Sequence, residues 1–342
     1  MITTKTSITA EDLFYPKSEP FDKGYLDVGD GHHVFYQQMG NPKGVPVLLV
    51  HGGPGLGIEA GDKTTRLHDP LYFRIIAVDQ RGCGQSKPHV AIDTAKALRH
   101  NTTEKLSDDF EKIRAHLNIP AWHVYGYSWG ACLAPYYAAN HPQHILSLTI
   151  GGIWMHTPEE IDWYINRMGL FMPEAEATLL SLLPPSVKRF DRLNYLYKSI
   201  TGKDKKQALK IAEAQGNFEF LATHFHAPEG IASTTEKMSR TEKTQFQKMM
   251  ISLGALEIFY MKENPLPANW YKTAKVKKSL KSIKDIALIQ GRYDIVCPPT
   301  TAYDFYQAHP HSKLTMVQYA GHKSSEPELL QAIIKENNRL KR

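Results

Sequence analysis

The chain of 342 residues is 42% apolar and 22% charged, and its formal net charge is +6. This length suffices for one large domain with an insertion, or for two domains, with a substantial buried core. The lysines gather at 203–206 and 272–284 without interleaved aromatic residues or an arginine-rich stripe. This pattern favours solvated helix faces and a linker, so we expect no nucleic-acid partner.

Cysteine usage and the apolar runs indicate the compartment. Cys83, Cys132 and Cys297 are too few and too scattered for a disulfide framework or a zinc site. Residues 1–30 lack a basic region followed by a continuous apolar one, so we expect no signal peptide. No apolar run approaches the roughly 20 residues that a membrane span requires. We therefore expect a cytoplasmic protein without membrane contact, metal or cofactor.

The first elements are predicted to be strands. Residues 24–39 alternate in polarity around Asp30-Gly31 and predict an antiparallel hairpin. Residues 45–50 form a continuous apolar run, which is typical of a strand buried on both faces of a parallel sheet. The glycine-rich loop His51-Gly52-Gly53-Pro54-Gly55 follows. It is either a flexible connection or, as in esterases with similar loops, a place where the N–H of Gly53 stabilises an oxyanion.

Residues 73–78 predict another strand, followed at 79–86 by a polar turn with two glycines. In that turn we expect Asp79 and Arg81 to form a structural pair that braces the loop. Residues 101–117 predict a helix with one apolar face, which leads to a strand at 122–127. Strand, helix and strand together predict a βαβ crossover.

The strand at 122–127 runs into Gly126-Tyr127-Ser128-Trp129-Gly130, which has the GxSxG form of a nucleophile elbow. In such an elbow a strand turns sharply into a helix with a serine at the apex, and glycines let the two elements pass closely. Alone, this five-residue motif is a weak signal, and a glycine-flanked turn is the plain alternative. If Ser128 is a nucleophile, the N–H groups of Trp129 and Gly53 are expected to form its oxyanion hole.

After a strand at 145–150, the alternation of strands and helices stops, and residues 154–270 show only helical periods. The simplest interpretation is a helical lid over the carboxyl edge of the sheet, where open α/β sheets bind ligands. We therefore expect an α/β-hydrolase fold with a mostly parallel sheet. Its core is predicted at 1–152 and 276–342, with a helical cap at 153–275 between the two parts.

Two late strands, at 286–290 and 314–319, are each followed by a residue suited to catalysis. Asp294 comes after the first and His322 after the second, so the chain order is serine, acid, histidine. Serine needs a base to accept its proton as it attacks, and histidine titrates near neutral pH. Asp294 is expected to accept the other ring N–H of His322 and to stabilise the imidazolium.

In this order the motifs HGGPG, DQRGCGQS, NTT, GYSWG, GRYD and GH resemble those of prolyl aminopeptidases (proline iminopeptidases), a serine peptidase family of the α/β-hydrolase fold. The resemblance covers nearly the whole chain from about residue 24. It implies an exopeptidase that removes N-terminal proline from peptides through an acyl-enzyme intermediate and without metal. The expected partner is a peptide with a free N-terminus, and no sequence pattern fixes the oligomeric state.

The resemblance also implies site residues. The nucleophile, acid and base correspond to Ser128, Asp294 and His322, and two cap carboxylates, Glu219 and Glu257, correspond to those that hold the substrate's free amine. The family's proline pocket corresponds to Trp154, Tyr164, Met261 and Cys297. A carboxylate in apolar surroundings requires a cation, which is either the substrate's ammonium group or an internal Arg or Lys.

The sequence departs from the family around the pocket and the cap. The family usually has glycine at Tyr127, arginine near Gly151, tryptophan at Phe218, and phenylalanine at Trp154 and Met261. These changes leave the three catalytic positions intact. A large Trp154 beside a flexible Met261 favours acceptance of other small apolar N-terminal residues besides proline.

Two other functions fit parts of the pattern. An esterase or amidase of the same fold, acting on small uncharged acyl compounds, would share the serine, the acid and the histidine but would not need Glu219 or Glu257. A catalytically inactive binding module would not need the three residues together. Cys297 and Cys83 are expected near the pocket, where they either make activity sensitive to thiol reagents or are buried and inert.

Overall fold

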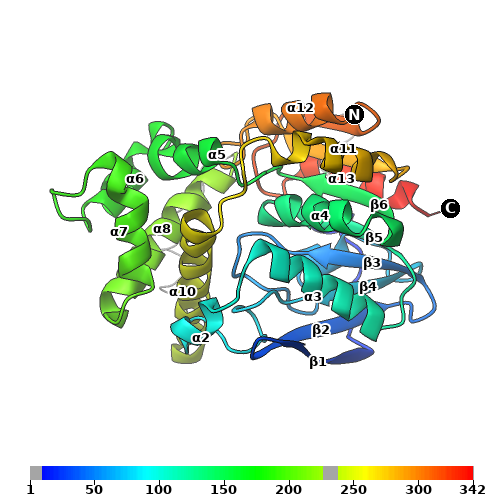
Figure 1. Ribbon diagram of the computed structural model, residues 1–342, viewed down its shortest axis with the longest axis horizontal. Coiled ribbons are helices and arrows are strands. Elements are labelled where there is room, and N and C mark those ends of the chain that lie inside the picture. Colours follow the sequence, from blue (N-terminus) through cyan, green and yellow to red (C-terminus); the bar gives the residue numbers. More distant parts are fainter. Residues whose placement is uncertain (1–9, 226–237, 342) are drawn as a thin grey trace, which may run out of the picture.

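The computed structural model describes residues 10–225 and 238–341. Residues 1–9, 226–237 and 342 lie outside the described residues, and so do those parts of the expected core and cap segments and of the segment 1–30 on which we expected no signal peptide. The described chain forms an eight-stranded sheet with the order β1-β2-β4-β3-β5-β6-β7-β8 (Figure 1). The strands are β1 (Asp22–Gly29), β2 (His32–Gly40), β3 (Val45–Val50), β4 (Phe73–Val78), β5 (Trp122–Tyr127), β6 (Ile145–Gly151), β7 (Ile286–Gly291) and β8 (Lys313–Val317).

The sheet is mostly parallel, as the sequence predicts. β1 and β2 form the expected antiparallel hairpin and β2 pairs antiparallel with β4, whereas all later neighbours pair in parallel. β3, β4 and β7 are buried on both faces, which explains their continuous apolar runs. The α/β-hydrolase fold class is therefore confirmed.

Helices cover both faces of the sheet. The helices are α1 (Ala10–Leu13), α2 (Thr94–Leu98), α3 (Thr103–His116), α4 (Trp129–Asn140), α5 (Pro158–Asp162), α6 (Pro173–Leu180), α7 (Arg192–Ile200), α8 (Lys205–Thr223), α10 (Arg240–Glu263), α11 (Ala274–Lys281), α12 (Pro299–Ala308) and α13 (Pro327–Arg339). Buried residues of α3, α4, α11 and α12 belong to the larger apolar core cluster, and those of α13 to a second cluster. Nearly all residues of α4 are buried, as expected for a helix that is apolar on every side.

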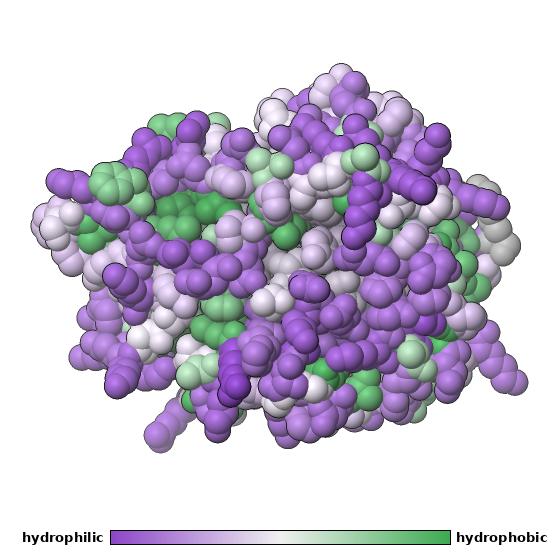
Figure 2. Space-filling model, viewed as in Figure 1, coloured by the Kyte–Doolittle hydropathy of each residue, from purple (hydrophilic) through white to green (hydrophobic). Residues whose placement is uncertain are grey.

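Helices α5 to α10 lie between β6 and β7 in the sequence and stand to one side of the sheet, at the left of Figure 1. We call them the cap. The cap begins with a capping box of Thr157 and Glu160, and α10 begins with another of Ser239 and Glu242. The expected boundary at residue 275 falls inside α11, which packs against α4 of the core. On the face shown in Figure 2 hydrophilic residues predominate, with small apolar patches over the cap.

One expected pair is not formed. Arg81 does not contact Asp79; its guanidinium group instead donates to both carboxylate oxygens of Asp109 on α3, at 2.6 and 2.8 Å. Asp79 accepts the backbone N–H groups of Ile58 and Gln85, both at 2.8 Å. The two side chains still brace the loop after β4, Asp79 through Gln85 within the loop and Ile58 outside it, and Arg81 through Asp109 on α3.

None of the helices within 10–225 and 238–341 is both long enough and apolar enough to cross a lipid bilayer.

Candidate active site

Ser128 stands at the sharp turn between β5 and α4. Its backbone has φ 57° and ψ −122°, a conformation that is strained for a residue with a side chain. A Cβ atom at Gly126 would lie 2.2 Å from the carbonyl oxygen of Gly130, and one at Gly130 would lie 2.1 Å from that of Val50. The two glycines of the motif are therefore required for the close approach of strand, helix and neighbouring β3, as the elbow interpretation expects.

The three residues expected as nucleophile, base and acid form one hydrogen-bonded row. Nε2 of His322 lies 3.0 Å from Oγ of Ser128, and Nδ1 of His322 lies 2.8 Å from Oδ2 of Asp294. In this arrangement Ser128 donates to His322, and His322 donates to Asp294. The order of donors leaves Nε2 free to accept the serine proton.

Other groups hold this row in place. Asp294 also accepts the side-chain amide of Gln290 at 3.0 Å and the backbone N–H of Cys297 at 2.8 Å. Burial alone would lower the pKa of His322, but the negative charge of Asp294 and the hydrogen bond that Asp294 accepts from the ring outweigh burial, so the pKa is raised. The hydroxyl of Tyr127 donates to the backbone carbonyl of His322 at 2.8 Å. Sequence reasoning singled out Asp294 and His322, which the structure brings together, but missed the contacts of Gln290 and Tyr127.

The two expected oxyanion donors flank Ser128. Trp129 is the first residue of α4, so its N–H has no acceptor within the helix. Gly53 lies in the loop after β3 with φ 39°, and it borders a cavity that Ser128 also lines. The adjacent Gly52 is so close that a Cβ atom there would lie 2.9 Å from Cβ of Ser128. The helix N-terminus and the glycine loop can therefore both meet a carbonyl oxygen at Ser128.

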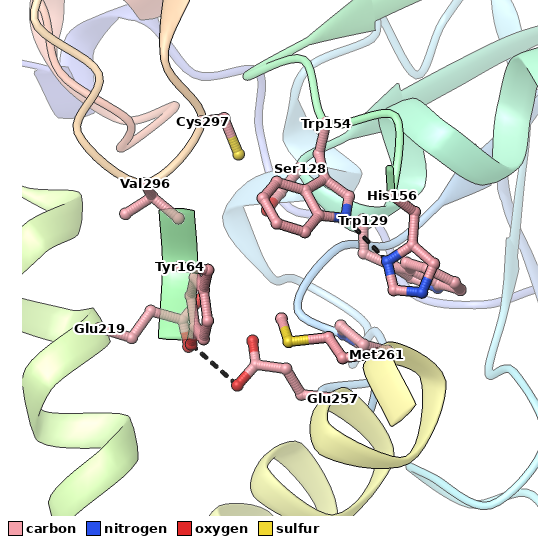
Figure 3. A pocket seen from close by; sticks show the side chains of 11 residues that line it. Ser128, Trp129, Trp154, His156, Tyr164, Glu219, Glu257, Met261, Val296 and Cys297 are labelled. Atoms are coloured by element: carbon pink, nitrogen blue, oxygen red, sulfur yellow. Dashed lines mark hydrogen bonds between the residues drawn. The ribbon is translucent and has the colours of Figure 1, made fainter. Parts of the chain in front are cut away.

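A small cavity of about 30 Å³ opens beside Ser128 (Figure 3). All six residues expected to bind substrate line it: Glu219, Glu257, Trp154, Tyr164, Met261 and Cys297. Pro54, His156 and Val296 complete the wall, and sequence reasoning missed them. The indole N–H of Trp154 donates to Nδ1 of His156 at 3.0 Å, which fixes the indole ring over the cavity.

The two cap carboxylates reach this cavity from different helices, Glu219 from α8 and Glu257 from α10 (Figure 3). The hydroxyl of Tyr164 donates to Glu257 at 2.9 Å and accepts the amide of Gln215 at 3.1 Å. Oε2 of Glu219 is buried without a hydrogen-bond partner. Burial raises the pKa of both carboxyl groups, and repulsion from Glu219 raises that of Glu257 further.

The alternative of an internal counter-ion is not seen. Within the described part of the chain, no Lys or Arg forms a salt bridge with Glu219 or Glu257. Two carboxylates that are 9% and 4% exposed thus share a cavity without a cationic side chain. Such a site has its own affinity for a cation.

A second, larger cavity of about 450 Å³ also borders Ser128. It shares Ser128 and Glu219 with the small cavity, and it also reaches His322. Its walls are mostly apolar side chains of α8, α10 and the loop after β3. No sequence pattern indicated this space, because its lining residues come from segments far apart in the chain.

Two of the departures from the family pattern, Tyr127 and Gly151, fit each other sterically. The ring of Tyr127 lies where a Cβ atom at Gly151 would approach it to 2.7 Å and one at Gly152 to 2.8 Å. Gly151, at the end of β6, and Gly152 have no side chains and therefore leave the space that the ring of Tyr127 fills. Phe218 is buried in the larger core cluster and does not line the small cavity.

The cysteines are buried, and burial raises the pKa of each thiol well above its usual range. This favours inert thiols over reactive ones. Two clusters of described side chains have the spacing of metal ligands: Glu111, His141 and His144, and Asp294, Cys297 and His322. In the first, Glu111 is already paired with Arg114, and in the second, Asp294 and His322 are hydrogen-bonded to each other.

The chain is similar to known proteins along most of its length. The family model of the alpha/beta hydrolase fold matches residues 45–222. A proline iminopeptidase from Xylella fastidiosa is 33% identical over 327 residues, which cover 94% of this chain and 96% of that protein. One from Arabidopsis thaliana is 31% identical over 98% of this chain and 84% of its own length. Among solved structures, a proline iminopeptidase from Mycobacterium smegmatis shares the fold with a TM-score of 0.56 at 20% identity, covering 93% of this chain and 98% of that one.

Proposed function

Because the chain belongs to the proline iminopeptidases, a family of the α/β-hydrolase fold, we propose that it is a serine aminopeptidase that releases N-terminal proline, or a similarly small apolar residue, from peptides. The observation that carries this proposal is the pair Glu219 and Glu257, buried beside Ser128 without an internal cation. A peptide's N-terminal ammonium group supplies the missing charge. This group belongs to the same residue as the scissile carbonyl, so anchoring it places the carbonyl of the first residue at Ser128 and explains a cut after one residue.

The chemistry proceeds in two steps. His322 accepts the proton of Ser128 as the serine oxygen attacks the carbonyl carbon of the N-terminal residue, while the N–H groups of Gly53 and Trp129 stabilise the oxyanion. The imidazolium of His322 then protonates the leaving amine, and the peptide bond breaks to give an acyl-enzyme. A water molecule, deprotonated by His322, releases the N-terminal residue and restores Ser128. Asp294 stabilises the imidazolium in both steps.

The small cavity supports a restricted first residue. Trp154, Tyr164 and Met261 line this cavity beside the two carboxylates, and its volume of about 30 Å³ is far below the roughly 450 Å³ of the large cavity, which favours a compact first residue. The thioether of Met261 is flexible, so alanine is a reasonable second substrate after proline.

The test is a panel of aminoacyl anilides with N-terminal Pro, Ala, Leu and acetyl-Pro. We expect kcat/KM to be highest for Pro, lower for Ala, much lower for Leu, and nearly lost for acetyl-Pro, because acetylation removes the ammonium group. Glu219→Gln and Glu257→Gln should each lower kcat/KM for Pro-anilide by roughly ten- to hundredfold, which is the usual worth of a charged hydrogen bond. Glu263→Gln, at the exposed end of the same helix α10, is the matched control.

The rival function makes the opposite prediction. An esterase or amidase acting on uncharged acyl groups would hydrolyse acetyl-Pro-anilide as well as Pro-anilide and would tolerate both Gln substitutions. That result would exclude the aminopeptidase. Labelling of Ser128 by a fluorophosphonate excludes an inactive binding module.

We further propose that the protein acts in the cytoplasm on peptides with free N-termini, without a metal or organic cofactor. The three buried free cysteines support a reducing compartment. Retention of full activity in EDTA is the expected result for the metal-independent reaction.

A further inference from the structure

The two cavities that meet at Ser128 are not equivalent. The small cavity holds the carboxylates that fit the substrate's ammonium group, but His322 does not line it. The large cavity is lined by His322. Because this imidazole must protonate the leaving amine, that amine lies on the side of the large cavity. The part of the substrate beyond the scissile bond therefore enters the large cavity.

We propose that the large cavity is a specificity site for the leaving peptide, which takes a short peptide with an apolar side chain and binds its free C-terminal carboxylate through Lys323. This proposal rests on the proposed aminopeptidase function and deepens it. It predicts a preference for short peptides over long chains, and for large apolar residues after the N-terminal proline.

The walls of the large cavity support the apolar preference. Phe220 of α8 and Phe246, Met249 and Leu253 of α10 line it, together with Leu56 from the loop after β3. These side chains enclose about 450 Å³, far more than the space beside Glu257. Burying a large apolar side chain there would raise kcat/KM by about tenfold or more, which is enough to distinguish phenylalanine from glycine.

Lys323 supplies a cation at this cavity. It follows His322 directly and is half-buried, and its ammonium group donates to Nε2 of His224. Nδ1 of His224 lies 2.7 Å from the backbone carbonyl oxygen of Phe220, so the ring donates at Nδ1 and accepts at Nε2. The neutral imidazole thus positions the ammonium group and leaves two of its N–H donors for a ligand.

No described acid neutralises this lysine. Within residues 10–225 and 238–341, Lys323 forms no salt bridge with a carboxylate. Glu326, the acid whose charge acts on it, uses its two oxygens to accept the backbone N–H groups of Phe225 and Gly321, at 2.7 and 2.6 Å. Partial burial lowers the pKa of Lys323. A half-buried ammonium group beside the leaving-peptide site is therefore available to a carboxylate.

The experiment compares peptides that differ only at the leaving end. The substrates are Pro-Gly, Pro-Phe and Pro-Phe-Ala as free acids, and Pro-Phe and Pro-Phe-Ala as C-terminal amides. We expect kcat/KM for Pro-Phe to exceed that for Pro-Gly at least about tenfold. For the dipeptide or the tripeptide, the acid should exceed the amide by about tenfold or more, as a charge-assisted hydrogen bond predicts.

Variants of Lys323 assign the carboxylate preference to this residue. Lys323→Met should reduce the acid-to-amide ratio to near one, and Lys323→Arg should restore it. Lys335→Met, at an exposed position on α13, is the control that keeps the wild-type ratio. Because each ratio is measured within one variant, a general loss of activity does not affect it.

Three outcomes would overturn the proposal: equal rates for Pro-Gly and Pro-Phe, equal rates for acids and amides in the wild type, or an acid-to-amide ratio that Lys323→Met leaves unchanged. Hydrolysis of Pro-anilide in the same preparation separates this failure from failure of the aminopeptidase function itself.

Discussion

Glu219 and Glu257, the residues that we propose bind the substrate's ammonium group, also carry a cost in stability. Both are buried, and burial disfavours their charged forms. In the absence of substrate, no described Lys or Arg side chain forms a salt bridge with either of them. The site is thus an example of function opposing stability.

Glu257→Gln should therefore stabilise the free protein at neutral and alkaline pH while it lowers activity. The folded-state pKa of Glu257 is raised above 4.5, so the wild type loses stability as pH rises from about 4.5 through the folded pKa. The gain from Gln should be absent below pH 4.5 and present at pH 8. Thermal melting at pH 4 and pH 8 measures it, and an increase in Tm of about 2 °C or more at pH 8 alone is expected. A lower Tm at pH 8 would contradict the unpaired-carboxylate interpretation.

Tyr127 is a second single residue whose substitution tests the site, because its hydroxyl donates to the backbone carbonyl of His322. Tyr127→Phe removes the hydroxyl that donates to the carbonyl of His322 and leaves the ring packing in place. We expect kcat to fall roughly three- to tenfold with little change in KM, because small displacements of a catalytic base reduce turnover more than binding. Tyr303→Phe, at an exposed position on α12, is the control. A change in KM alone would argue against a positioning role.

At the scale of elements, the loop after β4 is joined to α3 and to the β1–β2 hairpin by one guanidinium group. Arg81 is fully buried, donates twice to Asp109, and also reaches Asp30 and the carbonyl of His100. The pairing could not be predicted, because its partners lie 28 and 51 positions away and the nearer Asp79 had an equal claim by sequence. Local patterns fix strands and helices, but they do not fix which acid a loop arginine meets.

Arg81→Met should destabilise the protein by about 3 to 5 kcal/mol, because it leaves Asp109 buried without its cation. The double variant Arg81→Met/Asp109→Leu should recover most of that loss. Urea unfolding of the two variants measures both values. Equal stability of the single and double variants would show that the pair contributes through packing and not through charge.

At the scale of the whole molecule, the sequence predicted the core better than the cap. The strands and the elbow follow from apolar runs, glycines and chain order, and the observed bounds agree within a few residues. In the cap, the sequence showed only helical periodicity, and the proposed roles of Glu219 and Glu257 came from the family resemblance. No sequence pattern indicated the large cavity or a binding role for Lys323. The cavity forms only where α8, α10 and the core pack together, and this packing cannot be read from local sequence.

A charge in the cap also affects the pKa of His322, the proposed catalytic base in the core. Besides Asp294, the charge of Glu219 on α8 raises the pKa of His322. The acid limb of kcat/KM should therefore lie above pH 6.5 in the wild type, since His322 must lose its proton to act as base. Glu219→Gln should move this limb to lower pH, whereas Glu257→Gln should move it less. A pH profile with Pro-anilide measures both, and an unmoved limb would show that cap and base are electrostatically independent.

The position of Ser128 at the junction of the two cavities has a kinetic consequence. In the proposed binding mode, the cleaved peptide leaves through the large cavity, and its departure lets the hydrolytic water enter. The N-terminal residue stays in the small cavity as an ester of Ser128 and is the last product to leave. Free proline should therefore compete with substrate for the resting enzyme, whereas the departed peptide should inhibit non-competitively. Initial rates with each product added would reveal this order, and the reverse pattern of inhibition would contradict it.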